Sequence, residues 1–528
     1  MAEPGALSGD HRVVVIGAGV GGLVSALLLA CRGLDVTLVE AAAEPGGKMR
    51  QIEVDGARID AGPTVFTMRW VFDQILAQAG SSVESLLTLE PLSVLARHAW
   101  RGGDARLDLL ADLQASADAI ARFSSPAEAR RYLAFCAEAR RVYRRLEGPH
   151  IRAQRPGFLG LVRALGPAGL GTLAALGPFA TMWQRLAHHF HDPRLQQLFG
   201  RYATYCGTSP WVAPATLMLV AHVEQCGVWS LRGGMHALAR ALAGLAQQRG
   251  ARLIFQQRCE RVETQAGRVT GVRLADGRLL KADSVVFNGD VGALAQGLLG
   301  DTVAQAARPV PVAQRSLSAL TWAVNAPTSG FPLVRHNVFF DNDYASEFDD
   351  VLRQRRLPRR GTVYVCAQDR DDTANAPDGS ERLLCLVNAP ADGDHNPLDV
   401  SEIASCQTRS LALLQHCGLQ VAPLPHQVQI TTPTDFNRLF PGTGGALYGA
   451  ASQGWTAVFK RSGASTPVTG LYLAGGSVHP GPGVPMAALS GLRAAETLMA
   501  HLDSTSRWRR VATSGGISTR SATTADTA

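Results

Sequence analysis

The stretch that decides the fold is HRVVVIGAGVGGLVSALLLACRGLDVTLVE, residues 11–40. The residues from Val13 to Ala30 carry no charge, and Arg12 stands directly before them. This length is compatible with a membrane span, which needs about 17–25 apolar residues, and the basic start is compatible with a secretory signal. The order of the glycines decides between these two interpretations and a third, a buried strand–turn–helix unit.

The glycines follow the order G-x-G-x-x-G, as Gly17, Gly19 and Gly22. They come after a β-branched run, residues 13–16, which is typical of a buried strand, and before residues 23–31, which are typical of an apolar helix. In a dinucleotide-binding turn the first glycine permits the bend and the second lets a pyrophosphate approach the backbone. The third lets the helix pack on the strand, and the helix N-terminus offers N–H groups to the phosphates.

A second strand, residues 36–39, leads to Glu40, which stands roughly 20 residues beyond the glycines. A carboxylate at this position accepts hydrogen bonds from the adenosine ribose of a dinucleotide. A lone G-x-G-x-x-G is a weak signal, but here strand, glycine turn, helix, strand and acid occur together. We therefore predict a buried βαβ dinucleotide-binding unit and expect no signal peptide.

The composition is that of a large globular protein. The 528 residues suggest two or more domains, and 46% of them are hydrophobic against 18% charged. The nine cysteines are far apart without C-x-x-C spacing or a His/Cys cluster, so we expect reduced, mostly structural cysteines in a cytoplasmic setting and no metal site. The net charge of +7 suits an anionic membrane, and we expect no nucleic-acid partner because no such module is recognisable.

Charge is distributed unevenly in the middle of the chain. Residues 122–163 hold ten arginines and three acids, and the next twenty residues, Ala164–Trp183, carry no charge. Prolines and glycines make this second segment a poor spanning helix. It is compatible with buried helical turns, or with a monotopic patch that dips into one leaflet while the arginines meet lipid phosphates. The polar tail, 504–528, is expected to be disordered.

Other segments also have nucleotide-fold character. The loop at residues 44–48 follows the second strand and is expected to lie over the cofactor. Residues 253–290 alternate as strands, with a hairpin signal at 275–277. Residues 471–496 predict a strand, a Gly/Pro loop and a helix that begins near Pro485. His479 in this loop is a candidate base, although a histidine there is more often a structural hydrogen-bonding group.

Five motifs carry a resemblance to a known family: GAGVGGL with Glu40, EPGGKM, DAGPTVF (60–66), GVWSLRGGMHAL (227–238) and LYLAGGSVHPGPGVPMA (471–487). Together they resemble the carotenoid desaturases, which belong to the phytoene desaturase group of the amine oxidase-like flavoproteins. NVFFDNDY (337–344), VYVCAQDR (363–370) and the Pro-Met-Ala of the last motif are similar to the bacterial 1-hydroxycarotenoid 3,4-desaturases, or methoxyneurosporene dehydrogenases.

The resemblance implies an α/β fold: a Rossmann-like FAD-binding domain of the amine oxidase/phytoene desaturase type with an inserted α+β substrate domain. The FAD-binding domain is expected to comprise 10–84, 251–294 and 431–503. The substrate and membrane-facing domain is expected to comprise 85–250 and 295–430.

The resemblance also implies which residues hold FAD. The glycine turn would meet the pyrophosphate, Lys48 would supply a point charge where relatives often have Arg, Val262 would lie near the adenine, and the last motif would follow the ribityl chain and the flavin ring. An acid is common in relatives at the position of Gly476, so the ribityl contact differs here. The expected cofactor-binding residues are Gly17, Ala18, Gly19, Gly22, Glu40, Gly47, Lys48, Val262, Gly475, Gly476, Ser477, Val484 and Met486.

The implied activity is desaturation of an acyclic carotenoid with a tertiary hydroxyl or methoxy end, at the 3,4 bond. A peripheral or monotopic location on the cytoplasmic side of the membrane would give access to such a substrate, and oxygen or a quinone would accept the electrons. Alternatives are a phytoene desaturase, another flavin oxidase such as a protoporphyrinogen oxidase, and a flavin-less prenyl-binding protein like the Rab GDP-dissociation inhibitors. The catalytic residues stay unknown, with His479 as the one candidate.

Overall fold

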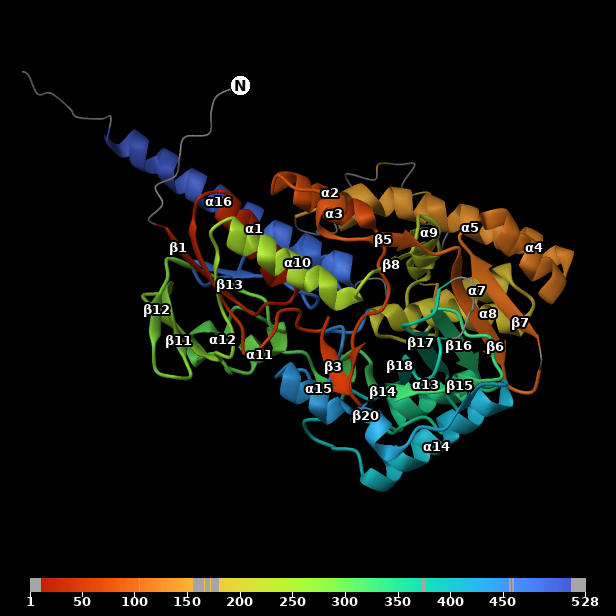
Figure 1. The fold of residues 1–528 in the computed structure, drawn as a ribbon. Coiled ribbons are helices and arrows are strands. Elements are labelled where there is room, and N and C mark those ends of the chain that lie inside the picture. The colour runs from red at the N-terminus through yellow and green to blue at the C-terminus, as the bar shows by residue number, and fades with distance from the viewer. Residues whose placement is uncertain are drawn as a thin grey trace, which may run out of the picture.

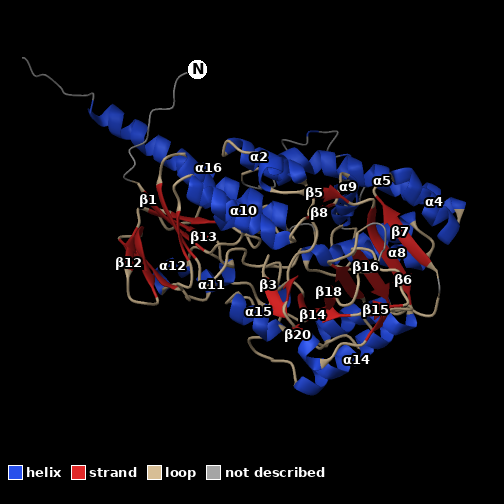
Figure 2. Ribbon diagram, in the orientation of Figure 1, coloured by secondary structure: helices blue, strands red, loops and turns tan. Residues whose placement is uncertain are grey.

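The computed structural model of the chain describes residues 11–103, 105–154, 166, 171, 180–371, 377–454, 457 and 460–513 (Figure 1). Its two largest sheets have five and seven strands, and a row of helices runs above both in the view of Figure 2. The five-stranded sheet lies in the expected FAD-binding domain and the seven-stranded sheet in the expected substrate domain, and we call them the cofactor side and the substrate side after these expectations.

A parallel five-stranded sheet contains the predicted βαβ unit. Its strands, in spatial order, are β21 (Leu471–Leu473), β13 (Ser284–Phe287), β1 (Arg12–Ile16), β2 (Asp35–Val39) and β9 (Arg252–Ile254). The helix α1 (Val20–Cys31) follows the glycine turn as expected. Strands from three distant parts of the sequence therefore lie side by side, and their carboxyl ends meet at one edge.

Alternate residues of β1 enter two different cores, because side chains alternate across a strand. Val13 and Val15 pack in the cluster that holds α1, α10 (Met235–Gln248) and the first part of α16 (Val484–Thr513). Val14 and Ile16 pack against the other layer. That layer is formed by β10 (Cys259–Gln265), β11 (Arg268–Leu274), β12 (Leu279–Lys281), α11 (Val291–Ala295) and α12 (Asp301–Ala304). The hairpin predicted at 275–277 is confirmed, because β11 and β12 pair antiparallel around it.

A seven-stranded mixed sheet forms the substrate side. Its order is β20 (Val428–Thr431), β14 (Ser318–Ala326), β18 (Glu381–Ala389), β17 (Val363–Ala367), β16 (His336–Phe340), β6 (Val94–Trp100) and β7 (Arg106–Leu110). Val338 and Phe340 pack in the core of one face and Phe339 in that of the other. The first core holds α4 (Leu113–Phe123), α5 (Pro126–Leu146), α7 (Met182–His189), α8 (Pro193–Gly200) and α9 (Leu219–Gln225), and the second holds α14 (Val400–His416).

Two short elements complete the frame around the cavity described below. The hairpin of β3 (Gln51–Val54) and β4 (Ala57–Asp60) follows the loop after β2. The Asp60 carboxylate accepts the Met235 N–H at 2.5 Å. The residue that ends β4 therefore receives a backbone donor from the first turn of α10, and the motifs 60–66 and 227–238 meet in space.

The structure departs from the expected boundaries at two points. The helix α10 was expected in the substrate domain, but its apolar face packs against α1 on the cofactor side. The helix α16 continues to Thr513, beyond the expected start of a disordered tail at 504, and residues 514–528 lie outside the described part.

The uncharged segment Ala164–Trp183 also lies outside the described residues, apart from 166, 171 and 180–183, so its burial or membrane contact stays a prediction. Among the helices that the structure describes, none combines the length and the apolar character needed to cross a membrane.

Candidate active site

A cavity of about 1580 Å³ lies between the two sheets. Its lining includes Ile16, Val39 and Phe287 at the carboxyl ends of β1, β2 and β13. On the opposite side the lining includes Leu384 and Leu386 of β18. Ligands of open parallel sheets bind outside the carboxyl ends of the strands, so the cavity lies where the sequence predicts a dinucleotide.

The glycine turn brings backbone, not side chains, to the cavity. Gly17 has φ +97°, a conformation that glycine adopts freely, and it lines the cavity together with Gly19. The helix α1 has no side-chain cap at Gly19, and its first helical bond runs from Leu23 N–H to the Gly19 carbonyl. The N–H groups of the first turn have no partner within the helix, so the turn suits an anionic group.

The loop after β2 closes on this turn. Gly46 N–H donates to the Ala18 carbonyl at 2.8 Å, and a Cβ on Gly47 would lie 3.2 Å from the Gly19 Cα. Gly47 lines the cavity as predicted. The two backbones therefore approach closely here, and a side chain at Gly47 would crowd the backbone of Gly19.

Two residues of the predicted set lie behind the cavity surface. Ala18 is fully buried and donates its N–H to Glu40 Oε2 at 2.6 Å. A Cβ on Gly22 would overlap the Gly17 carbonyl, so this glycine permits close packing of helix on turn. Neither Ala18 nor Gly22 lines the cavity, so their expected contact with the cofactor is replaced by a supporting role.

Glu40 is held in place by backbone donors. Its Oε2 accepts from Ala18 and its Oε1 accepts from Ala42 N–H at 2.8 Å, while the side chain lines the cavity. Each carboxylate oxygen can accept a further hydrogen bond. The position and the acceptor chemistry fit a ribose diol.

The structure places Val262, which was expected near the adenine, behind the cavity surface. Its side chain is fully buried in the core under β10, its N–H donates to the Leu299 carbonyl, and it does not line the cavity. The chain reaches the cavity a few residues earlier, where residues 257–260 line it. The residues nearest to an adenine in this part of the cavity are therefore those just before β10 and at its start.

The last motif forms the wall opposite the glycine turn. Gly475, with φ +110°, Gly476 and Ser477 line the cavity, as do Val484 and Met486 at the start of α16. The first turn of this helix points unpaired N–H groups toward the cavity edge, where a reduced flavin ring would gain negative charge. Met486 lines the cavity at this helix start, and its position beside the flavin ring stays a prediction.

Lys48 lines the cavity, but its ammonium group contacts a different part of the site from the glycine turn where it was expected. Its Nζ donates to the Leu447 carbonyl at 2.6 Å and lies 5.3 Å from the centre of the Phe440 ring. Burial lowers its pKa. Lys48 therefore joins the loop after β2 to the segment 440–448 across the cavity, and is not a free point charge beside the glycine turn.

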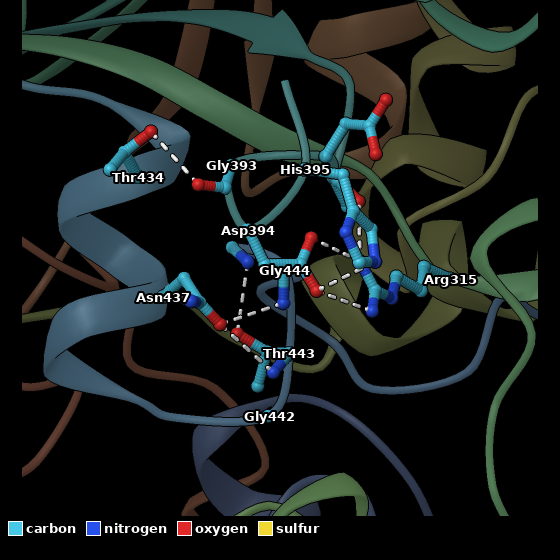
Figure 3. A network of polar contacts seen from close by, with 12 residues as sticks. Arg315, Gly393, Asp394, His395, Thr434, Asn437, Gly442, Thr443 and Gly444 are labelled. Atoms are coloured by element: carbon cyan, nitrogen blue, oxygen red, sulfur yellow. Dashed lines mark hydrogen bonds and ion pairs between the residues drawn. The ribbon is translucent and has the colours of Figure 1, made fainter. Parts of the chain in front are cut away.

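A polar network anchors the segment 440–448 from behind (Figure 3). Arg315 donates to both carboxylate oxygens of Asp394, each at 2.7 Å. The Asn437 Oδ1 of α15 (Pro433–Leu439) accepts from Gly444 N–H at 2.9 Å, and Gly393 N–H donates to the Gly444 carbonyl. The network ties this stretch of the cavity lining to the loop after β18.

Arg461 is a cavity cation that the sequence analysis missed. Its guanidinium donates to the carbonyls of Tyr448, Ala450 and Gly476 at 2.7–3.2 Å. Burial lowers its pKa. Arg461 therefore connects the segment 448–450 with the loop beside the expected flavin ring, and it places positive charge in that loop.

His479 is not placed to act as a base. Its side chain is 2% exposed and does not line the cavity. Its Nε2 hydrogen-bonds the Ala153 carbonyl at 3.0 Å, and burial lowers its pKa to about 4. His479 is therefore a neutral imidazole that donates a hydrogen bond to a carbonyl. This is the structural role that the sequence analysis named as the alternative to a catalytic base.

A second group of polar residues lies among the apolar walls. Arg201 of η2 (Arg201–Cys206), Tyr205 and Glu224 of α9 all line the cavity. Tyr202 donates its hydroxyl to Glu224 Oε2 at 2.6 Å. Burial raises the pKa of Glu224 to about 7, against the lowering effect of this hydrogen bond and of Arg201. The sequence analysis missed this group of residues. The signal that could have revealed it is Glu224, an isolated acid within the apolar run LMLVAHVEQCGVW (217–229).

The residues at the cofactor end fit a flavin dinucleotide. Two glycine-built backbones approach each other at the uncapped start of α1, and Glu40 supplies the ribose acceptor. The start of α16 supplies the ring-side N–H groups. These features define an FAD-binding oxidoreductase.

Comparison with known proteins agrees with this class. Residues 20–499 match the family described as flavin containing amine oxidoreductase, and the chain belongs to this family. FAD is therefore the cofactor of the site. The predicted family, cofactor and enzyme class are confirmed.

Relatives named hydroxyneurosporene desaturase match nearly the whole chain. The one from Rubrivivax gelatinosus is 65% identical, over 99% of this chain and 99% of its own. The one from Cereibacter sphaeroides is 45% identical, over 94% of this chain and 99% of its own.

Among solved structures, wild-type putrescine oxidase bound to putrescine has a TM-score of 0.56 at 16% identity, over 93% of this chain and 99% of its own. An oxidoreductase from Methanosarcina mazei has a TM-score of 0.58 at 17% identity, over 92% of this chain and 100% of its own. These likenesses support the α/β fold.

Proposed function

We propose that the protein is an FAD-dependent desaturase of acyclic carotenoids that carry a hydroxyl or methoxy group on carbon 1, and that it introduces the 3,4 double bond. The observation that carries the proposal is the continuity of one cavity from the glycine turn to apolar walls on the substrate side. Relatives of 65% and 45% identity bear the name hydroxyneurosporene desaturase.

When bound, FAD accepts the hydride that a desaturation removes. Carbon 4 of the substrate is allylic to the polyene, so loss of hydride leaves a positive charge that the polyene delocalises. The proton on carbon 3 then becomes acidic enough for water or a weak base to take it. Two electrons and two hydrogens leave, and one carbon–carbon double bond forms.

The residues of this chain have binding and orienting roles in such a reaction. The glycine turn, Glu40 and the loop 475–477 hold the cofactor. Residues such as Leu217, Val220 and Val223 form an apolar wall that excludes water and orients a hydrocarbon. Orientation against the ring at the start of α16 is the main contribution that this geometry makes.

We further propose that the protein works at the cytoplasmic surface of a membrane, since its substrate is dissolved in lipid. The arginine-rich stretch 122–163 supplies positive charge for anionic headgroups. Oxygen or a membrane quinone would reoxidise the flavin.

The test is a turnover experiment with labelled substrate. FAD-loaded protein is mixed with liposomes that contain 1-hydroxyneurosporene deuterated at carbons 3 and 4. The proposal predicts a product that has lost one deuterium from each carbon and absorbs at longer wavelength. Loss of hydrogen from other carbons, or no product from protein with full flavin, would overturn it.

A further inference from the structure

We propose that Arg201, Tyr205 and Glu224 form a binding site for the oxygen at the end of the substrate, and that this site selects hydroxylated over purely hydrocarbon polyenes. The inference rests on the proposed function and adds the residues that recognise the substrate class. We call these three residues the hydroxyl site.

Arg201 is buried with one nitrogen of its guanidinium unpaired within the described part of the chain. It is 7% exposed, and its Nε has no hydrogen-bond partner among the described residues. Its guanidinium lies 5.4 Å from the centre of the Tyr364 ring, and it interacts with the Tyr205 hydroxyl and with the charge of Glu224. A buried donor without a partner costs free energy, and an oxygen brought by a ligand would remove this cost.

Glu224 is oriented by hydroxyls from its own side of the cavity. Tyr202 donates to Oε2, and the Tyr205 hydroxyl also contacts the carboxyl group. Tyr205 exposes 38% of its surface and lines the cavity. The group thus offers both acceptors and donors, as an alcohol requires, whereas a methyl ether can use only the donors.

The three side chains of the hydroxyl site are polar, whereas the cavity wall around them is largely apolar. Apart from Asn388 of β18, the neighbouring lining residues on α9 and β18 are hydrocarbon, namely Leu219, Val220, Val223, Leu384 and Leu386. A polyene chain needs only such walls, so it gives no reason for a guanidinium and a carboxyl group beside them. An oxygen at one end of the polyene would give a reason for both groups.

The hydroxyl site is close to the expected flavin loop. Gly207, two residues after Tyr205, packs so closely on Tyr448 that a Cβ would lie 2.6 Å from that ring. The Tyr448 carbonyl accepts from Arg461, which also donates to the Gly476 carbonyl. In the proposed substrate the oxygen sits on carbon 1, two bonds from carbon 3, so an oxygen-binding group is required close to the reacting carbons.

The test measures affinity with FAD-loaded protein and three polyenes in detergent micelles: 1-hydroxyneurosporene, its methyl ether and neurosporene. Kd is obtained from quenching of protein fluorescence. We expect wild-type protein to bind the alcohol at least about 10-fold more tightly than neurosporene, the ratio expected for one or two buried hydrogen bonds. Arg201→Met should bring the Kd of the ether to that of neurosporene and reduce the preference for the alcohol, with the neurosporene Kd unchanged.

Glu224→Leu should weaken binding of the alcohol alone, because the ether has no proton to donate. Tyr143→Phe is the matched control: Tyr143 is buried on α5 beside α9 but does not line the cavity, so the alcohol preference should persist. Glu224→Gln, which keeps the shape and one acceptor, should retain part of the preference if Leu disturbs folding.

An unchanged ratio of alcohol to neurosporene Kd in Arg201→Met would overturn the proposal. So would a Glu224 variant that slows anaerobic flavin reduction equally with all polyenes at unchanged Kd, since that marks a proton acceptor. Failure of the proposed function itself is distinguishable, because wild-type protein would then form no 3,4-desaturated product from the alcohol or the ether, whatever their Kd values.

Discussion

The Lys48 ammonium donates a hydrogen bond of 2.6 Å to the carbonyl of Leu447, a residue 399 positions away in the chain. This contact closes the cavity between the loop after β2 and the segment 440–448. The cation is therefore part of the frame that shapes the cofactor end of the site.

Removal of this cation should loosen the frame. Lys48→Met is expected to lower the free energy of unfolding by about 1.5–3 kcal/mol, the range for a hydrogen bond to a charged group, and to reduce the flavin retained per protein. The ratio of flavin to protein absorbance and Tm measure both effects. Lys48→Arg should retain more flavin than Lys48→Met; equal retention in the two variants would contradict the role given to the charge.

A side chain at Gly19 should abolish flavin retention. A Cβ there would lie 2.8 Å from Asn288 Nδ2, and larger side chains would fill the space beside the uncapped start of α1. Gly19→Val should therefore purify without yellow colour while remaining folded by circular dichroism. Gly244→Ala is the control, because its Cβ would meet nothing within 4 Å and its helix α10 tolerates alanine. A Gly19→Val protein with full flavin would refute the assignment of the turn.

The network in Figure 3 should stabilise the segment 440–448. Asp394→Asn leaves the buried Arg315 guanidinium without its carboxylate, and losing one partner of a buried pair costs about 3–5 kcal/mol. Because the pair keeps some exposure on the Asp394 side, we expect the lower end of this range. Tm and flavin retention should fall together; a lower Tm with undiminished retention would show that the network does not support the cavity.

Buried His336 should make stability depend on pH. Burial and the neighbouring Arg335 lower its pKa to about 3, and its Nδ1 hydrogen-bonds the Tyr364 hydroxyl. The unfolded chain binds a proton near pH 6.5 that the folded chain excludes, so this stability is complete above pH 6.5 and is lost as pH falls toward 3.

The loss attributable to His336 between pH 6.5 and 5 is about 2 kcal/mol. His336→Asn removes the titrating group, so the Tm advantage of wild-type protein over the variant should shrink as pH falls from 7 to 5. A Tm difference that stays constant over this range would contradict the assignment.

The nucleotide unit was predictable because its signals are local. Within residues 11–40 the β-branched strand, the glycine spacing and Glu40 specify the turn without reference to the rest of the chain. The start of α16 was predictable for the same reason, since glycines and prolines mark its boundary.

The residues that the sequence analysis misplaced or missed have positions that depend on tertiary packing. Val262 was assigned to the adenine by the resemblance, but the register of β10 turns its side chain into the core. Arg201 and Glu224 lie on separate elements, and only the folded chain brings them to one wall. His479 could not be judged without its burial, because sequence does not reveal which loop residues face a cavity.

The most direct test of the central claim is anaerobic flavin reduction. FAD-loaded protein is mixed in a stopped-flow instrument with liposomes carrying either 1-hydroxyneurosporene or neurosporene. The account predicts bleaching of the flavin absorbance together with a red shift of the polyene spectrum for the hydroxylated substrate, and neither change at a comparable rate for neurosporene. Oxidised flavin that persists with 1-hydroxyneurosporene, in protein that holds a full complement of FAD, would contradict it.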